Sequence, residues 1–336
     1  MRAITYTESG GPDVLQLTEL PTPDPGPGEV RVRLALSGVN PTDWKRRSTA
    51  TPGGTPQTPN QDGAGTVDAV GEGVPADRVG ERVWVWEAAW ERTGGTAAEH
   101  TVVRAEQAVP LGDHPVELGA ALGIPFMTAH RCLTVAEHLP RQLSPGSLAG
   151  VPVLVQGGAG AVGNAAIQLA HWAGATVITT VSSPEKAALA RAAGADHVVD
   201  YRTEDVAARV REIAPDGVRA VVEVSIRANA EVDTKVVAQH ASIAVYADDG
   251  GPEFSAPTRA FMALNTRFQF VMVYTAPAEA KAQAVADITA ALADGAIRVG
   301  EDAGLPLHTY ALADTAAAHQ AVQDAAVGKV LVDVTA

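Results

Sequence analysis

The sequence has a single cysteine among its 336 residues. One thiol, Cys132, cannot form an internal disulfide, and one thiolate cannot build a cysteine-rich structural zinc site. We expect Cys132 to pack in the core, because its neighbours are apolar and free cysteine is frequently buried.

Runs of basic residues and long apolar stretches are also missing. The formal net charge is −14, with 25 Lys and Arg against 39 Asp and Glu, so phosphate backbones and anionic lipid surfaces would repel the protein. No stretch is long enough to span a bilayer, and residues 1–6 lack the apolar core of a signal peptide. We therefore expect a cytoplasmic protein with neither a nucleic-acid nor a membrane partner.

The composition and the pattern along the chain favour two globular domains. Hydrophobic residues make up 46% of the chain and charged residues 19%. The first 120 residues are short alternating segments such as 30–36, separated by Pro- and Gly-rich turns such as 21–28, which predicts a β-rich barrel. From about residue 120, apolar strands (151–155, 175–181, 220–224, 243–246) alternate with alanine-rich helices, one of them running from Pro184 to Gly194. This alternation predicts an α/β fold with a doubly wound parallel sheet of the Rossmann type.

The motif that carries chemistry lies between the first of these strands and the helix after it. Gly158, Ala159, Gly160, Ala161, Val162 and Gly163 match G-x-G-x-x-G. Glycines at these places allow a sharp turn and a close approach of the backbone to a pyrophosphate, whose charge the helix N-terminus then meets. The alternative is a glycine-rich turn without a ligand.

The end of the second strand distinguishes the two nicotinamide cofactors. Proteins that bind NAD place an Asp or Glu about 20 residues beyond the glycines, on the ribose hydroxyls. Ser182 occupies that place, and Ser182, Ser183 and Lys186 offer donors for a 2′-phosphate. We therefore predict NADPH as the cofactor, although Lys186 alone is equally well explained as a solvated helix residue.

Three segments resemble the medium-chain dehydrogenase/reductase family, in particular its quinone oxidoreductases and zeta-crystallin. They are 34–44, 119–130 and 328–332, and the similarity extends over essentially the whole chain. The resemblance implies a β-rich GroES-like catalytic domain at 1–122 and 275–336, and a Rossmann NADP-binding domain at 123–274.

The family's zinc-dependent members carry a Cys, a Gly-His-Glu and a second Cys where this chain has Asn40, residues 60–62 and Ile124. Asn40, Gln61 and Ile124 offer neither thiolate nor imidazole, so no three-ligand catalytic zinc site is expected. Without that Lewis acid, the reduction of an electron-poor acceptor is favoured over the oxidation of an alcohol.

The resemblance also implies roles for individual residues. The catalytic candidates are Asn40, Lys45 and Thr128. The substrate-pocket candidates are Trp44, Trp90, Phe126 and Tyr246. Beyond the glycine motif, the candidate cofactor contacts are Ser182, Lys186, Tyr201, Asn229, Tyr246, Ala247, Asp248, Val271, Met272 and Val273.

Two of these roles have alternatives from the residues alone. Asn40 either donates to a developing oxyanion or holds its loop through local backbone bonds. Trp90, in a loop that also contains Trp84 and Trp86, either stacks on a planar quinone or is a core or interface residue.

The chain departs from the family pattern at three positions. Lys45 replaces a frequent Tyr, Ala161 replaces a frequent second glycine, and Asp324 stands where some relatives place an arginine on the 2′-phosphate.

The resemblance implies NADPH-dependent, zinc-free reduction of quinones or related electron-poor carbonyl acceptors by direct hydride transfer. The first alternative is an NADPH-dependent enoyl or 2-alkenal reductase acting on a biosynthetic intermediate, and the second is a non-catalytic NADPH-binding redox sensor. The apolar stretch 268–274 predicts a final sheet strand whose edge pairs two subunits, so we expect a homodimer.

Overall fold

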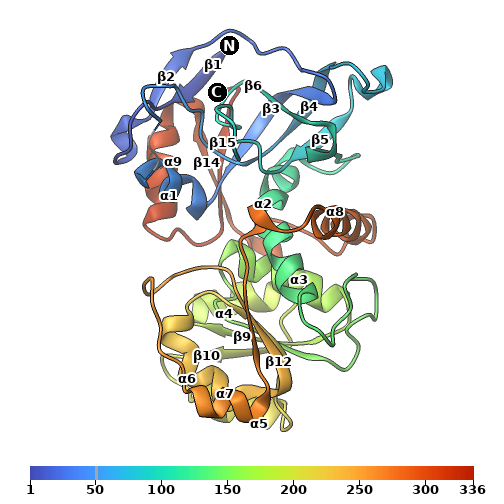
Figure 1. The fold of residues 1–336 in the computed structure, drawn as a ribbon, viewed down its shortest axis with the longest axis vertical. Coiled ribbons are helices and arrows are strands. Elements are labelled where there is room, and N and C mark those ends of the chain that lie inside the picture. Colours follow the sequence, from blue (N-terminus) through green and yellow to red (C-terminus); the bar gives the residue numbers. More distant parts are fainter. Residues whose placement is uncertain (50–51) are drawn as a thin grey trace. The chain divides into compact units, whose positions relative to one another are not determined.

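The computed structural model describes residues 1–49 and 52–336. The chain divides into two compact units, which we call the first unit (Met1–Ile124 with Leu307–Ala336) and the second unit (Pro125–Pro306). Residues 275–306, expected in the catalytic domain, therefore belong to the second unit. Figure 1 shows the elements of each unit.

The reason for this boundary is helix α8 (Ala278–Ala293), which packs within the second unit. Its buried face includes Ile288 and Leu292. Asp287 accepts hydrogen bonds from the His130 ring at 2.7 Å and from the Leu143 backbone N–H at 2.7 Å. Residues 275–306 thus continue the core of the cofactor-type domain.

The first unit is built on β-strands. Its larger sheet has the order β14-β15-β3-β4-β5-β7, with β6 also paired to β3, and a separate two-stranded sheet pairs β1 with β2. The strands are β1 (Arg2–Thr5), β2 (Gln16–Glu19), β3 (Glu29–Val39), β4 (Asp62–Val70), β5 (Arg82–Val85), β6 (His100–Arg104), β7 (Ala108–Pro110), β14 (Leu307–Ala311) and β15 (Lys329–Asp333). The helices are α1 (Pro41–Thr49), α9 (Thr315–Gln323) and the short 3-10 turns η1 (Pro12–Val14), η2 (Ala76–Arg78), η3 (Ala105–Gln107) and η6 (Leu312–Asp314).

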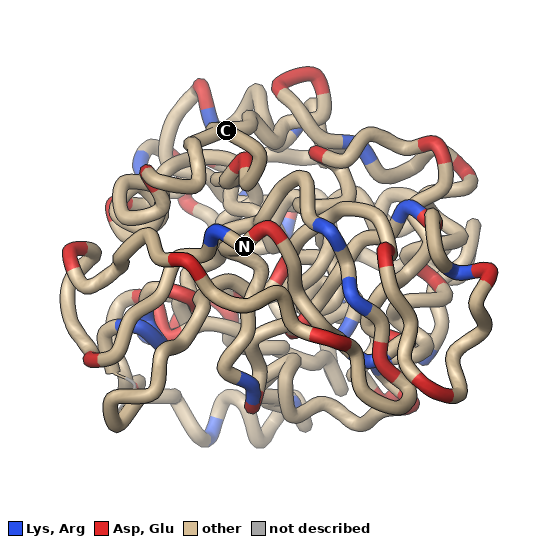
Figure 2. Tube along the Cα trace, turned by 90° about the horizontal axis from the view of Figure 1, so that it is seen from above, with Lys and Arg blue, Asp and Glu red and all other residues tan. Residues whose placement is uncertain are grey.

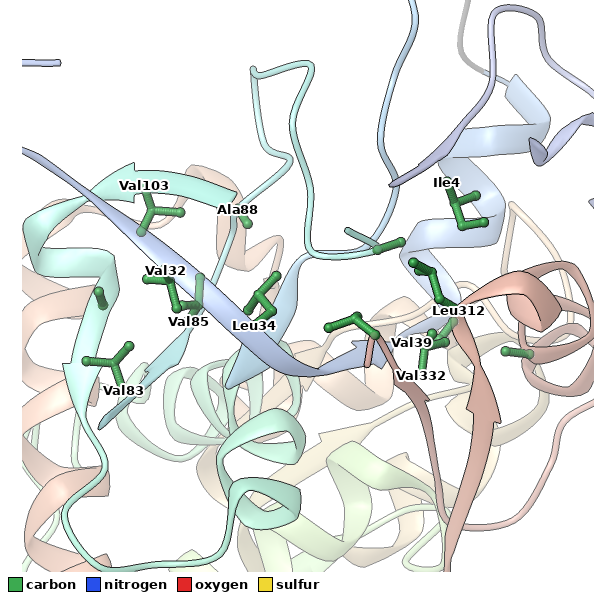
Figure 3. Packing of buried hydrophobic residues seen from close by; sticks show 14 of the residues in the cluster. Ile4, Val32, Leu34, Val39, Val83, Val85, Ala88, Val103, Leu312 and Val332 are labelled. Atoms are coloured by element: carbon green, nitrogen blue, oxygen red, sulfur yellow. The ribbon is translucent and has the colours of Figure 1, made fainter. Parts of the chain in front are cut away.

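Alternation along β3 creates the core of the first unit. Val30, Val32 and Leu34 are buried, and the residues between them are more exposed. Figure 3 shows Val32 of β3 beside Val85 of β5, and Val39 of β3 beside Val332 of β15, all within one apolar cluster. The period of two places Val30, Val32 and Leu34 on one face of the sheet.

The helix α2 (Val116–Thr134) contains the boundary between the units. Gly123 departs from helical geometry there, with φ −16° and ψ −110°, and Pro125 follows inside the helix. Proline removes one backbone donor and clashes with the preceding turn, which explains the kink.

The second unit is a six-stranded parallel sheet in the order β10-β9-β8-β11-β12-β13. The strands are β8 (Pro152–Val155), β9 (Thr176–Val181), β10 (His197–Asp200), β11 (Val218–Glu223), β12 (Val237–Val245) and β13 (Arg267–Phe270). The connecting helices are α3 (Ala161–Trp172), α4 (Pro184–Ala192), α5 (Val206–Ile213), α6 (Ile226–Val236) and α7 (Thr258–Leu264), and the 3-10 turns are η4 (Val273–Thr275) and η5 (Glu301–Ala303). The order reverses between β8 and β11, so the predicted doubly wound sheet is confirmed.

Local signals in the sequence account for helix α4. Ser183 caps it by accepting the Lys186 backbone N–H, Pro184 occupies its first position, and Gly194 beyond its end has a φ of 106°. This matches the expected helix from Pro184 to Gly194. The final strand is shorter than expected, because the 3-10 turn η4 ends it after Phe270.

Acidic residues predominate on the chain. Figure 2 shows Lys and Arg interspersed with Asp and Glu along the trace rather than gathered into one run. Within residues 1–49 and 52–336, no helix is long and apolar enough to cross a membrane.

Candidate functional site

The turn between β8 and α3 carries the glycine motif at the carboxyl edge of the parallel sheet. The Gly160 N–H donates to the Gly157 carbonyl oxygen at 3.1 Å and closes the turn. A Cβ at Gly158 would lie 2.1 Å from Thr179 Oγ1, and a Cβ at Gly163 would lie 2.3 Å from the Gly157 carbonyl oxygen. Packing of the turn therefore requires both outer glycines.

Gly160 has a different surrounding. It is exposed, and a Cβ there would meet only the Gly157 carbonyl oxygen, at 3.5 Å. It is also the N-cap of α3, a position at which no side chain caps the helix. The space beside Gly160 is therefore open at the start of α3, the positive end of the helix dipole, where the first backbone N–H groups of a helix have no intrahelical acceptor. This arrangement fits the pyrophosphate of a dinucleotide.

The ends of β9 and β10 bring together the residues expected at the adenosine end of the cofactor. Lys186 Nζ donates to Ser182 Oγ at 3.1 Å. Tyr201 follows β10 with 53% of its surface exposed, and its backbone N–H donates to the Val181 carbonyl at 3.0 Å. Positions 182 and 183, which directly follow β9, are both serine. The site therefore offers hydroxyls and an ammonium where an NAD-binding protein offers a carboxylate.

Two buried carboxyls belong to Glu223, at the end of β11, and Asp233, on α6. Each residue is 0% exposed. Asn229 Nδ2 donates to Glu223 Oε1 at 3.0 Å, and Gln156 Nε2 donates to Asp233 Oδ1 at 3.3 Å. Burial raises the pKa of both carboxyls, and the Glu223 charge raises the pKa of Asp233 further. Burial and the mutual repulsion of the two carboxyls therefore favour a shared proton over two negative charges.

Sequence reasoning missed this pair and placed Asn229 on the ribose. In the structure the Asn229 amide is engaged by Glu223. The available signal was an acidic residue that ends an otherwise apolar strand, at 220–223.

The remaining expected cofactor residues follow β12 and β13. The Tyr246 backbone N–H donates to the Glu223 carbonyl at 3.0 Å, Ala247 is the next residue, and Asp248 forms a bridge with Ser225. Burial raises the pKa of Tyr246, so its hydroxyl stays protonated.

Beyond β13, the Val271 backbone N–H donates to the Val245 carbonyl at 2.7 Å. Met272 is 59% exposed, whereas Val273 is buried. Residues 271–273 therefore lie at the carboxyl end of β13, at the same edge as the glycine turn.

Two further candidates lie on α2 in the second unit. Thr128 is buried at 6% exposure, and Phe126 is completely buried. Phe126 is therefore packed in the core of the second unit, and its role in the substrate pocket stays a prediction. Cys132, on the same helix, is buried as expected, and burial raises the pKa of its thiol.

In the first unit, Asn40 is part of a buried polar cluster. Asn40 Nδ2 donates to Asp62 Oδ2 at 2.6 Å, and Lys329 Nζ donates to Asn40 Oδ1 at 2.7 Å. Lys329 Nζ also lies 3.4 Å from Asp62 Oδ2, and the Ile124 backbone N–H donates to Asp62 Oδ1 at 2.9 Å. We call Asn40, Asp62 and Lys329 the buried triad. Sequence reasoning singled out only Asn40 among them.

Asp43, on α1, lies next to the buried triad. It accepts the Asn40 backbone N–H at 2.7 Å. Burial and the Asp62 charge raise the pKa of Asp43 to about 8. The carboxyl is therefore mostly protonated at neutral pH.

The other candidates of the first unit are partly exposed. Trp44 and Lys45 lie on α1, and Lys45 Nζ is 5.9 Å from the centre of the Trp44 ring. Trp90 is partly exposed, whereas Trp84 and Trp86 are buried at 0% and 6% exposure. Trp84 lies on β5 rather than in the loop, and of the three tryptophans only Trp90 keeps the accessibility that stacking on a ligand requires.

The positions that resemble zinc ligands have a different donor chemistry here. Gln61 Oε1 accepts the Ala89 backbone N–H at 3.1 Å, and Ile124 contributes only a backbone N–H. The Lys329 ammonium contacts both Asn40 and Asp62 and would repel a dication. In the described part of the chain, no group of three or more His, Cys, Asp or Glu is placed to hold a metal ion. These donors do not fit the family's zinc site.

Comparison with known proteins supports both units. The model of the alcohol dehydrogenase GroES-like domain matches residues 26–113, and that of the zinc-binding dehydrogenase matches residues 161–290. The quinone oxidoreductase of Lama guanicoe is 30% identical over 98% of this chain and 97% of its own. The chloroplastic NADPH-dependent alkenal/one oxidoreductase of Arabidopsis thaliana is 35% identical over 61% of this chain and 54% of its own.

Among solved structures, the mycobacterial protein Rv1454c complexed with NADPH is similar, with a TM-score of 0.82 and 32% identity. The similarity covers 99% of both chains. Together with the fold and the glycine turn, these similarities show that the chain belongs to the quinone oxidoreductase group of the medium-chain dehydrogenase/reductase family.

Proposed function

We propose that the protein reduces quinones, or related electron-poor carbonyl acceptors, with NADPH and without zinc. The observation that carries the proposal is the edge of the parallel sheet. There an exposed Gly160 begins α3, and Lys186 and Ser182 stand where a carboxylate would select NAD. The NADPH complex of the mycobacterial relative and the quinone oxidoreductases among the relatives support the same cofactor and acceptor class.

The reaction balances with one proton. Bound NADPH supplies a hydride equivalent, the acceptor also takes up a proton, and the products are NADP⁺ and a hydroquinone or saturated carbonyl. The chain's contribution is to hold the cofactor at the glycine turn and to offer hydrogen-bond donors to an oxygen that becomes negative. Asn40 is the proposed donor in the first unit. Lys45 and Thr128 remain candidates for the same role, and Trp44, Trp90, Phe126 and Tyr246 remain candidates for the pocket.

The experiment is NADPH oxidation followed at 340 nm with metal-stripped protein, comparing NADPH with NADH, and a benzoquinone with a short 2-alkenal. We expect faster turnover with NADPH and the quinone, and no effect of a chelator. A clear preference for NADH would contradict the cofactor assignment. Loss of activity with chelator, restored by zinc, would contradict the zinc-free assignment.

The second candidate is an NADPH-dependent enoyl or 2-alkenal reductase, which the Arabidopsis relative favours. Faster turnover with the alkenal in the same assay would select it. NADPH binding without turnover of any acceptor would select a redox sensor instead.

We also propose a homodimer formed along β13. This strand is the edge of its sheet, and Phe270 and Met272 beside that edge are each 59% exposed. Exposed apolar side chains along a free strand edge favour pairing with a second copy. Sedimentation at micromolar concentration should give the dimer mass, and Phe270→Asp should shift it toward the monomer.

We place the enzyme in the cytoplasm, where cells supply NADPH, and subcellular fractionation would test this.

A further inference from the structure

The buried triad lies where three neighbouring strands meet in the first unit. The sheet order β15-β3-β4 places Val330 opposite Val39 and Gly38 opposite Asp62. Lys329 at the start of β15, Asn40 just after β3 and Asp62 at the start of β4 therefore lie side by side. Lys329 is 1% exposed and Asp62 is 0% exposed.

Two glycines keep space for these side chains. A Cβ at Gly38 would lie 3.1 Å from Lys329 Cε and 3.2 Å from Asp62 Cβ, as well as 2.2 Å from the Ala120 carbonyl oxygen. A Cβ at Gly123 would lie 2.0 Å from Asp62 Oδ1. The local backbone is thus shaped around the triad.

The hydrogen-bond pattern fixes the Asn40 carboxamide. Lys329 can only donate, so it requires Asn40 Oδ1 on its side. Asp62 accepts three donors, from Asn40, Ile124 and Lys329, which is the pattern of an ionised carboxylate, so it requires Asn40 Nδ2 on its side. A flipped amide would oppose ammonium to NH₂ and carboxylate to carbonyl oxygen. Only one orientation satisfies both partners.

In this orientation the triad uses only one of the two N–H groups of the Asn40 amide. Asn40 Nδ2 carries two hydrogens, and within the described residues only Asp62 accepts from it. The ammonium on Asn40 Oδ1 also withdraws electron density from the amide, which makes the remaining N–H a stronger donor. A buried ammonium is costly, so burial lowers the pKa of Lys329; the Asp62 charge opposes this shift, and the neutral Asn40 Oδ1 accepts a second N–H of the ammonium.

We propose that Lys329 is a positioning residue for the reaction: its ammonium locks the Asn40 carboxamide so that one amide N–H is available to the oxygen of the acceptor. The proposal rests on the function proposed above. Lys329 thereby fixes a neutral donor at the locus where zinc-dependent relatives carry a ligand of their Lewis acid.

The test compares Lys329→Met with Arg47→Met in the full chain. Arg47 is a second buried cation of the same unit, at 1% exposure, and its side chain donates to Gln323 Oε1 rather than to any member of the triad. We expect Lys329→Met to lower kcat by about 10- to 100-fold, with the dissociation constant of NADPH unchanged within about twofold. Arg47→Met should keep kcat near wild type per folded molecule.

A second readout separates positioning from a structural role. The loss in Lys329→Met should grow as the quinone becomes less electron-poor, because such acceptors depend more on stabilisation of the developing oxyanion. In an Asn40→Ala background, Lys329→Met should have little further effect on kcat, because the two residues act as one unit. If Lys329→Met does not fold, Lys329→Met with Asp62→Asn removes both charges and keeps the test available.

The outcomes distinguish the two proposals. An inactive wild type defeats the proposed function, and a crystal structure of Lys329→Met then tests the inference through the Asn40 side chain, which should leave its wild-type rotamer when only Asp62 still holds it; an unchanged rotamer overturns the inference. An active wild type with unchanged kcat in Lys329→Met overturns the inference. So does an equal loss in both the wild-type and Asn40→Ala backgrounds, or a weakened NADPH affinity that accounts for the whole effect.

Discussion

The two units give their buried carboxyls different partners. In the first unit, the buried triad pairs an ammonium with a carboxylate and satisfies both through Asn40. In the second unit, Glu223 and Asp233 are buried beside amides, and burial raises the pKa of both. An ammonium is thus the partner of a buried carboxyl in the first unit, whereas amides and a second carboxyl are the partners in the second unit, and burial raises the pKa of the carboxyls in both. The difference suits a division in which the first unit presents polarised donors and the second binds a cofactor carrying its own negative charge.

The largest expected effect tests the donor in the first unit. Asn40→Ala should lower kcat by about 10²- to 10³-fold, the usual cost of losing an oxyanion donor, and leave NADPH affinity unchanged. The measurement is steady-state kinetics with a quinone together with NADPH titration by fluorescence. Asn229→Ala, in the second unit, is the matched control and should not reproduce this selective loss of kcat. A weakened NADPH affinity in Asn40→Ala would contradict the proposed division, in which the first unit donates to the acceptor and the second unit binds the cofactor.

The glycine turn separates packing from binding within the second unit. Gly163→Ala brings a Cβ to 2.3 Å from the Gly157 carbonyl oxygen, so we expect a loss of about 1–3 kcal/mol in unfolding free energy. Gly160→Ala should change stability by less than about 1 kcal/mol and yet weaken NADPH binding, because it narrows the approach of the pyrophosphate. Denaturant unfolding and NADPH titration check both variants. Equal effects of the two on stability would contradict the assignment of Gly160.

Acidic pH should lower the unfolding free energy through His319, in the first unit. His319 is 0% exposed, and burial, followed by the Arg47 charge, lowers its pKa to about 3. A neutral histidine in the folded state costs stability wherever the unfolded chain binds a proton, from about pH 6.5 down to about pH 3. Between pH 7 and pH 5 this amounts to about 2 kcal/mol. His319→Gln should flatten the fall of unfolding free energy over that range.

In the second unit the dependence has the opposite sign, because a rise in pH should lower the stability that Asp233 contributes. The pKa of Asp233 is raised in the folded state. The stability that its protonated form contributes is therefore fully present below the unfolded-state pKa of about 4, and it is lost as the pH rises through the folded-state pKa. Asp233→Asn keeps the acceptor for Gln156 and removes the titration. Its unfolding free energy, measured from pH 5 to pH 9, should fall less than that of the wild type. Parallel curves for the two proteins would show that the carboxyl pair does not hold the proton.

The smallest expected effect concerns the choice of cofactor. Ser182→Asp places a carboxylate at the end of β9, where it would repel a 2′-phosphate and accept from ribose hydroxyls. We expect the ratio of kcat/KM for NADPH to that for NADH to fall about 10-fold or more. An unchanged ratio in Ser182→Asp would move the phosphate site elsewhere.

Local patterns in the sequence were sufficient for much of the fold. The glycine turn, the cap at Ser183 and the apolar strands of the parallel sheet depend on neighbours in the sequence, and each was predictable. The boundary at residues 275–306 was not, because the packing of α8 depends on contacts such as that of Asp287 with His130, 157 residues apart.

The candidate site divides in the same way. The positions of Gly160, Ser182 and Lys186 beside strand ends were predictable from the local pattern, and their role in cofactor binding stays a prediction. The roles of Asp62 and Lys329 were not, since their ion pair joins residues 267 positions apart. A lysine near the end of a chain is normally solvated, and no pattern in the sequence marks this one as buried.

The lone cysteine makes the protein unusually convenient to label. Cys132 is 1% exposed, and its raised pKa keeps the thiol protonated, so maleimide reagents should leave the native chain untouched. A cysteine introduced on the surface of each unit would then be the only reactive pair. A fluorophore on each would report directly whether the units move when cofactor or quinone binds.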